Sequence, residues 1–128
     1  MISGAGVDIV EIPRMKEAVE KWGRGFLEKV FTAREIAYSN SKRFSPQHFA
    51  ARFAAKEAVI KAFGAPRAHP LRWTDIEVVN NEEGRPSIRF SGDALALKKK
   101  KKIKDVIISM SHSHNYAVAQ AILLKKGR

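Results

Sequence analysis

The sequence contains no cysteine, so disulfide bonds and thiolate chemistry are both excluded. It also lacks an apolar run approaching the ~20 residues that a membrane span needs, and an N-terminal basic segment followed by an apolar one. No internal repeat or linker-like stretch divides its 128 residues. We therefore expect residues 1–128 to form one soluble, cytoplasmic domain, whose 45 % apolar content is enough to build a core.

Acidic residues are few: 13 Asp and Glu face 24 Lys and Arg, which leaves a net charge of +11. Such an excess attracts polyanions or an acidic partner. The run Lys98–Lys102 is compatible with nucleic-acid binding. It is explained better as the last turn of a short helix capped by Ser91, where the helix dipole favours cations. The strands also offer few aromatic residues for stacking on bases, so we expect no nucleic-acid partner.

The hydrophobic pattern predicts an α+β domain in which helices pack on one side of an antiparallel sheet. The expected order is β-α-α-α-β-β-α-β-β. The predicted elements are a strand over 2–11, helices over 13–22, 32–39 and 46–63, a hairpin of strands 75–79 and 87–90, a short lysine-rich helix, and a second hairpin of strands 105–113 and 116–124 that turns near His114 and Asn115.

Local signals set the expected helix boundaries. Thr32 followed three residues later by Glu35 is a capping box. Ser45 is a good N-cap, with Pro46 suited to the first helical position, and Gly64 supplies a C-terminal stop. These signals make the helix over 46–63 the clearest element of the sequence.

The first strand carries a carboxylate within an apolar run, Gly6-Val7-Asp8-Ile9-Val10. Alternate side chains of a strand face opposite ways, so we expect Val7 and Ile9 to face the core and Asp8 to point away from it. Beside Gly6, Asp8 could be an acceptor in a turn or cap. A carboxylate in an apolar strand more often has a charged partner or an ion.

The third helix carries one carboxylate, Glu57, among the cations Arg52, Lys56 and Lys61. Glu57 follows Phe53 and precedes Lys61 by four residues each, so the three lie in one row. On spacing alone, an ordinary exposed ion pair between Glu57 and Lys61 is the favoured explanation. Alternatively, Asp8 and Glu57 are two oxygen donors of the kind that Mg²⁺ binds together with water and phosphate oxygens.

Two further polar groups are ambiguous on their own. Ser111, His112 and His114 form a cluster near the C-terminus, in which the two histidines would share a strand face. Without a Gly-x-Ser-x-Gly motif, Ser111 is a poor nucleophile candidate, and a lone His112 is more often structural. The segment Gly84-Arg85-Pro86 would let a backbone approach a phosphate, but a hairpin turn explains it as well.

Taken in order, these pieces resemble the holo-acyl-carrier-protein synthase family, the small bacterial type of 4'-phosphopantetheinyl transferase. The resemblance spans residues 2 to about 123. Its matching segments are Gly6 to Ile12 with Arg14, Phe31-Thr32-Ala33-Arg34-Glu35, Arg52 to Ala58 with Lys61, Asp75-Ile76-Glu77, Gly84-Arg85-Pro86, and Ser109 to His112 with Tyr116 to Ala119.

The resemblance implies transfer of the phosphopantetheine arm of coenzyme A to a serine of apo acyl carrier protein, with release of adenosine 3',5'-bisphosphate. It implies Mg²⁺ on Asp8 and Glu57, and catalytic roles for Glu57, Lys61 and His112, with the general base left open because a metal-bound Glu57 is a poor base. The residues expected to contact coenzyme A are Arg52, Lys56, Lys61, Gly84, Arg85, Pro86, Ser111 and His112.

The resemblance also implies an assembly and a docking face. Small members of the family form homotrimers with sites between subunits, whereas larger monomeric relatives carry a second acid at the position of Val10. We expect the acidic carrier protein to meet cations on and after the first helix, above all Arg14 and Arg24, with Lys16 and Lys21 nearby. A divalent-metal phosphohydrolase is the remaining alternative, but two acids are fewer than most two-metal sites supply.

Overall fold

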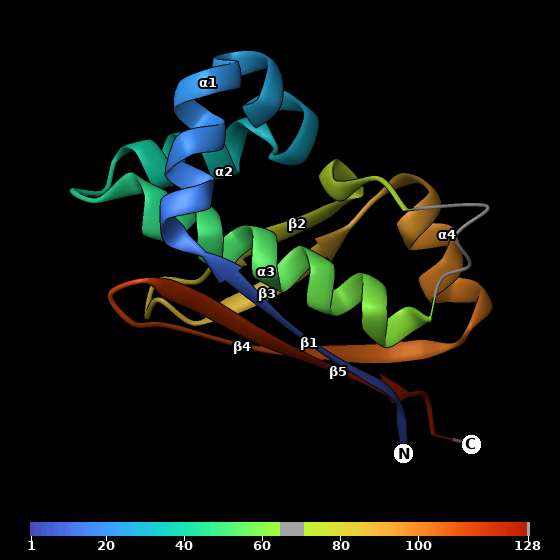
Figure 1. The fold of residues 1–128 in the computed structure, drawn as a ribbon. Coiled ribbons are helices and arrows are strands. Elements are labelled where there is room, and N and C mark those ends of the chain that lie inside the picture. The colour runs from blue at the N-terminus through green and yellow to red at the C-terminus, as the bar shows by residue number, and fades with distance from the viewer. Residues whose placement is uncertain (65–70, 128) are drawn as a thin grey trace.

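A computed structural model describes residues 1–64 and 71–127. Figure 1 shows the helices gathered on one side of a long antiparallel sheet, as the sequence predicts. The elements are β1 (Ile2–Glu11), α1 (Ile12–Val30), α2 (Ala33–Asn40), α3 (Ser45–Phe63), the 3-10 turn η1 (Trp73–Asp75), β2 (Ile76–Asn80), β3 (Pro86–Phe90), α4 (Gly92–Lys100), β4 (Ile103–His112) and β5 (Tyr116–Lys125). Among the described residues, no helix is long and apolar enough to cross a membrane.

The strands form two sheets where the sequence predicted one. In the first, β5 lies between β1 and β4, and both pairings are antiparallel. The second is the β2–β3 hairpin, which pairs with no other strand of the described residues. Hydrophobic alternation marks strands but does not say which strands pair across a long separation in sequence, so it could not separate the two sheets.

The predicted capping signals are partly correct. Thr32 and Glu35 form the full capping box, and Gly64 ends α3 in a left-handed conformation with φ of 61°. Of the two predicted serine caps, Ser45 is wrong, whereas Ser91 holds the N-cap position of α4 but makes no side-chain hydrogen bond to the helix. Phe44 holds the N-cap position of α3, and the Ser91 hydroxyl lies 3.4 Å from an Asp75 oxygen instead of capping α4.

The first helix is longer than the predicted 13–22, because its second half follows a kink. Gly23 has φ of 57° and ψ of −140°, a backbone conformation that side chains disfavour. The chain then resumes as helix, and Leu27 and Val30 enter a buried cluster with Phe31 and Phe49. A glycine pair looks like a helix stop in the sequence, and only this packing shows that the helix continues.

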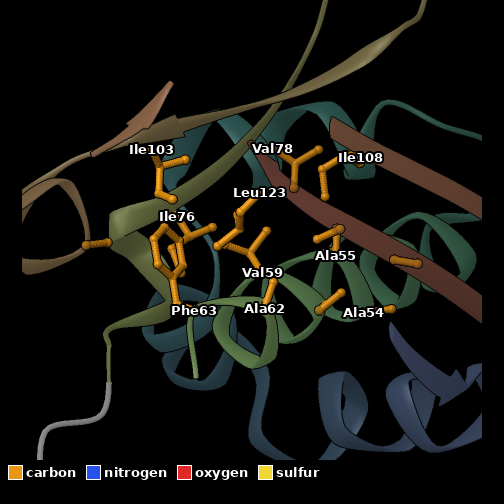
Figure 2. Close-up of a cluster of buried hydrophobic side chains, with 14 residues drawn as sticks. Ala54, Ala55, Val59, Ala62, Phe63, Ile76, Val78, Ile103, Ile108 and Leu123 are labelled. Carbon is orange, nitrogen blue, oxygen red and sulfur yellow. The ribbon is translucent and has the colours of Figure 1, made fainter. Parts of the chain in front are cut away.

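The core forms where α3 lies across the sheet, and Figure 2 shows its buried apolar side chains. Alanines face each other there: Ala54, Ala55 and Ala58 on α3 are fully buried, and Ala119 and Ala121 on β5 are buried opposite them. Small side chains let the helix backbone come close to the strands. A side-chain carbon on Gly6 would lie only 2.0 Å from the Ala58 carbonyl oxygen.

The predicted orientation of β1 is wrong. Val7 and Ile9 are 58 % and 63 % exposed, while the alternate positions Gly4 and Gly6 face α3, so Asp8 shares the helix-facing side. The error arose from treating the bulkiest side chains as the core face. Here the core face of β1 is the glycine side, because α3 packs too close for anything larger.

We predict that Gly6→Ala destabilises the fold by about 2 kcal/mol or more, since its methyl group would overlap backbone that cannot move away freely. Urea unfolding followed by circular dichroism would measure this. Gly25→Ala is the matched control, because nothing lies within 4 Å of that position and alanine favours helix. Equal stability of the Gly6→Ala variant and the unaltered protein would contradict the close packing.

Candidate functional site

A cavity of about 380 Å³ opens where the end of β1 meets α1 and α3. We call it the carboxylate cavity, because Asp8 from β1 and Glu57 from α3 both line it. Arg14 from the first turn of α1 lines it too. Met15 and Phe26 from α1 and Phe53 from α3 supply apolar walls. The structure thus brings together three residues that the sequence singled out from separate segments.

Asp8 is held by a lysine of the facing helix. Its Oδ1 lies 2.9 Å from Nζ of Lys61, and only 17 % of the Asp8 side chain is exposed. Lys61 also donates to the carbonyl oxygen of Val7 at 3.3 Å, and its side chain remains 55 % exposed. Lys61 therefore pairs with Asp8. The ion pair between Lys61 and Glu57 that their spacing in the sequence allowed is not formed.

Glu57 has an aromatic partner that the sequence analysis missed. Trp73 Nε1 donates to Glu57 Oε1 at 3.3 Å, and the Trp73 ring packs against Phe53 with centroids 5.8 Å apart. Trp73 lies in η1, immediately before the Asp75-Ile76-Glu77 segment. In the sequence, Trp73 is distinguished only by its position next to the Asp75-Ile76-Glu77 motif.

Lys56 is not placed where the sequence predicted. Its side chain is fully buried, and Nζ donates to Glu35 Oε1 at 2.5 Å and to the carbonyl oxygens of Val30 and Trp73 at 2.9 and 3.0 Å. Burial lowers the pKa of the Lys56 ammonium, and the Glu35 carboxylate opposes that shift. All three ammonium hydrogens are used inside the protein, so this lysine offers no donor to a phosphate.

Arg52 is also buried, and it ties α3 to the hairpin turn. Its Nη2 donates to Asn80 Oδ1, whose amide in turn donates to the Gly84 carbonyl oxygen at 2.9 Å. The guanidinium stacks over the Tyr38 ring at 3.9 Å, and burial lowers its pKa. Among the described residues, Arg52 Nε finds no hydrogen-bond partner.

The Gly84-Arg85-Pro86 segment forms a hairpin turn, which is one of the two interpretations that its sequence allowed. Asn81 Oδ1 accepts from the backbone nitrogens of Glu83 and Arg85, and Gly84 has φ of 85°. Through Asn80 this turn is linked to Arg52. These groups lie outside the carboxylate cavity, whose walls come from β1, α1 and α3.

The serine and histidine at the end of β4 point to opposite sides of the sheet. His112 continues the face of Ile108 and Met110, which pack toward α3, and its charge lowers the pKa of His48 on α3, after burial, Arg52 and Lys42. Ser111 is in register with Val118 and Ile9 on the outer face. His114 lies in the turn beyond β4, so the prediction that it shares a strand face with His112 is wrong.

The two cations predicted for the carrier protein occupy different places. Arg14 lines the carboxylate cavity. Arg24 lies beyond the kink of α1, where its Nε is 2.6 Å from Glu28 Oε1 and both side chains are largely exposed. Of these two arginines, only Arg14 lies beside Asp8 and Glu57.

The chemistry of the carboxylate cavity is that of hard-cation and phosphate recognition. Asp8 and Glu57 offer only oxygen, Lys61 offers a half-exposed ammonium, and the remaining ligands would be water or substrate oxygens, as Mg²⁺ prefers. Within residues 1–64 and 71–127 no group of three or more His, Cys, Asp or Glu side chains could hold a metal. The donor set therefore fits a metal shared with a phosphorylated ligand, and does not fit a closed structural site.

Comparison with known proteins identifies the class of this fold and site. The family model described as "4'-phosphopantetheinyl transferase superfamily" matches residues 4–121. A holo-[acyl-carrier-protein] synthase from Geotalea daltonii is 42 % identical over 125 residues, which cover 98 % of this chain and 100 % of the relative.

Solved structures agree with the sequence relatives. Holo-[acyl-carrier-protein] synthase from Neisseria meningitidis superposes with a TM-score of 0.87 at 27 % identity, over 98 % of this chain and 100 % of that one. The Bacillus anthracis enzyme in complex with CoA (3',5'-ADP) gives 0.79 at 32 % identity, over 98 % and 99 %. The chain belongs to the 4'-phosphopantetheinyl transferase superfamily and, within it, to the holo-[acyl-carrier-protein] synthases. The resemblance found in the sequence is confirmed.

Two lysines five positions apart on α3 should behave in opposite ways. We predict that Lys56→Met costs about 3–5 kcal/mol of stability, because it leaves the buried Glu35 carboxylate without its cation. Lys61→Met should change stability by less than about 1 kcal/mol, because its pair is partly exposed, yet it should impair activity. Thermal unfolding and transfer assays on both variants would check this. A Lys56→Met variant with full stability and weakened coenzyme A binding would restore the original assignment.

Proposed function

We propose that this protein transfers the 4'-phosphopantetheine group of coenzyme A to a serine of apo acyl carrier protein, a reaction of fatty acid biosynthesis. The observation that carries the proposal is the convergence of Asp8 and Glu57 on one cavity beside Arg14, with Lys61 paired to Asp8. That arrangement offers a place for a pyrophosphate and its metal next to a cation suited to an acidic protein. The names of the relatives described above add the substrate class.

In this reaction the carrier serine Oγ attacks the phosphorus next to the pantetheine, and a new P–O bond forms. The bond from that phosphorus to the bridging oxygen of the pyrophosphate breaks, and adenosine 3',5'-bisphosphate leaves with the electron pair. The serine proton passes to a base or to water. Such transfers depend chiefly on positioning and on stabilising charge, so cations around the pyrophosphate matter even when they move no proton.

Asp8 and Glu57 would hold Mg²⁺, which when bound would neutralise charge on the pyrophosphate. Trp73 fixes the Glu57 carboxylate by its indole N–H, and Phe53 supports the ring. Lys61 holds Asp8 in the free protein, and its half-exposed ammonium leaves hydrogens for a phosphate oxygen. In our proposal Lys61 neutralises the leaving phosphate. Glu57 is the nearest candidate base, and the identity of the base stays open.

His112 and the Gly84 to Pro86 turn would complete the coenzyme A site. His112 lies on the same sheet face as Asp8, two strands away and in register with Val10, so it is offset from Asp8 by two residues along the strand as well as by about 9.5 Å across the sheet. Arg52 would act mainly by fixing the turn through Asn80. Ser111 and Arg85 would contact coenzyme A only if a neighbouring subunit brings a site to them.

We further propose a homotrimer with sites between subunits. The outer face of the sheet carries an apolar surface that the helices leave uncovered: Val7, Ile9 and Ile107 are 58 %, 63 % and 43 % exposed, with Val118 and Ile122 between them in register. A second copy of this chain would bury that surface. Ser111 shares this face, so association would also bring it next to a neighbour. The cytoplasmic location stays a prediction from the sequence.

The carrier protein is proposed to dock at the first helix. Arg14 lies at the rim of the carboxylate cavity, in the first helical turn, where the helix dipole does not favour a cation. Its placement there is best explained by an acidic partner whose serine must reach the cavity. Arg24 would extend this surface, although its pairing with Glu28 weakens the contribution.

The first test measures the reaction and the metal acids together. We predict that incubation with coenzyme A, Mg²⁺ and an apo carrier protein adds the mass of the phosphopantetheine arm to the carrier. Asp8→Asn and Glu57→Gln should each slow this by about 100-fold or more, because each removes a charge that acts on the transferring group. Asp93→Asn, an exposed acid in the first turn of α4, is the control. Full activity of either site variant would refute the metal assignment.

The second test concerns assembly. We predict that the protein is a trimer by light scattering and that its specific activity falls on dilution, because a partial site needs its neighbour. Ile9→Glu should dissociate it by placing a charge in the apolar interface. Lys99→Glu, on the exposed side of α4, should leave the trimer intact. A monomer that is fully active at nanomolar concentration would contradict the proposal.

The third test concerns the docking face. We predict that Arg14→Glu raises KM for the carrier protein with little change in KM for coenzyme A. Added salt should weaken carrier affinity of the unaltered protein, since exposed charges are screened over about 8 Å at physiological ionic strength. Arg89→Glu on β3 is the charge-matched control. An unchanged carrier KM for Arg14→Glu at low and high salt would locate the docking face elsewhere.

A further inference from the structure

A second cavity, of about 390 Å³, lies at the far end of the molecule and is lined by lysines. Its walls come from the β1 start, the α4–β4 turn and the β5 end. The lining residues are Ser3, Lys100, Lys101, Lys102, Lys125 and Lys126. We call it the lysine cavity. Ser3 and Asp8 are five residues apart on β1, about 17 Å along the strand, and in Figure 1 both chain ends and α4 lie at the end of the sheet away from α1.

The backbone holds these lysines together. The nitrogen of Lys126 donates to the Lys102 carbonyl oxygen at 2.9 Å, and the nitrogen of Lys125 donates to that of Met1 at 3.0 Å. Lys101 Nζ donates to the carbonyl oxygen of Phe63 at 2.5 Å, which fixes the turn against the end of α3. The fold itself therefore brings these lysines together, because hydrogen bonds fix the segments that carry them.

The helix dipole explains only part of this cluster. It accounts for Lys98, Lys99 and Lys100, which lie in the last turn of α4, and of these three only Lys100 lines the cavity. Lys125 and Lys126 lie at the end of a strand, where no such dipole acts. Lys102 follows the helix with φ of 57°, and among the described residues it is the one non-glycine residue with positive φ. Glycine or asparagine would adopt that conformation at lower cost.

We propose that the lysine cavity binds a compact anion carrying two or more phosphoryl groups, either free or as the headgroup of a lipid. Lysine ammonium groups are point-charge donors suited to phosphate oxygens. Among the described residues, the lining contains no acid and no aromatic ring, so these residues offer nothing to recognise a base or an extended apolar ligand. The cavity is separate from the proposed transfer site and does not depend on it.

The test compares two double variants that remove the same charge. Lys100→Gln/Lys126→Gln removes two cavity lysines, whereas Lys99→Gln/Lys104→Gln removes two exposed lysines outside it. Tripolyphosphate binding is measured by calorimetry on the full-length protein at physiological ionic strength. We expect the cavity variant to weaken binding by about tenfold and the control to bind like the unaltered protein. Transfer activity should be the same in all three.

Further probes identify the source of the anion. Vesicles of cardiolipin, whose headgroup carries two phosphoryl groups, are compared with vesicles of phosphatidylcholine to test a lipid headgroup, and binding that only the cavity variant loses would assign that source. Loss confined to free tripolyphosphate would assign a soluble ligand. The proposal is overturned if tripolyphosphate does not bind saturably, if both variants weaken it equally, or if a short single-stranded oligonucleotide is the only probe that requires the cavity lysines.

Discussion

The buried carboxylate of Glu35 is the interaction on which the arrangement of the other elements depends. It accepts hydrogen bonds from the Thr32 nitrogen at the start of α2, from Lys56 of α3, and from the Val78 nitrogen of β2. Lys56 then reaches the carbonyl oxygens that end α1 and begin η1. One ion pair thereby connects three helices to the small sheet. A buried pair is weak evidence for added stability, but it strongly penalises arrangements that leave either charge alone.

The same connection extends to the transfer site. Lys56 holds the backbone of Trp73, and the Trp73 indole holds the Glu57 carboxylate. On the other side of α3, the close approach to β1 at Gly6 brings Lys61 to Asp8. The two acids are thus positioned by independent contacts that meet on one helix. A change at the helix–strand contact should displace Asp8, whereas a change in the buried ion pair should displace Glu57.

Local signals in the sequence predicted much of this fold, and its long-range packing could not be predicted from them. The Thr32–Glu35 capping box and the Gly64 stop depend on neighbours in the chain, and both are confirmed. The orientation of β1 depends on the distance of a helix far away in sequence, so apolar bulk at Val7 and Ile9 was misleading. Asp8 and Glu57 were identified by their residue types and family motifs. The burial of Lys56 could not be predicted, because a lysine beside a motif carboxylate has the same sequence pattern whether it is buried or exposed.

The net charge of +11 is best understood as several separate populations of cations. Buried Lys56 and Arg52 are structural, since internal acceptors or an aromatic ring hold both. Arg14 lines the carboxylate cavity and Lys61 pairs with Asp8 beside it, where an acidic partner and developing negative charge would meet them. The lysine cavity gathers a third group at the opposite end of β1. Exposed charges act over about a Debye length, roughly half the distance between the two cavities along β1. The charges at one end therefore contribute little field at the other, and the excess at the lysine cavity requires a cause of its own.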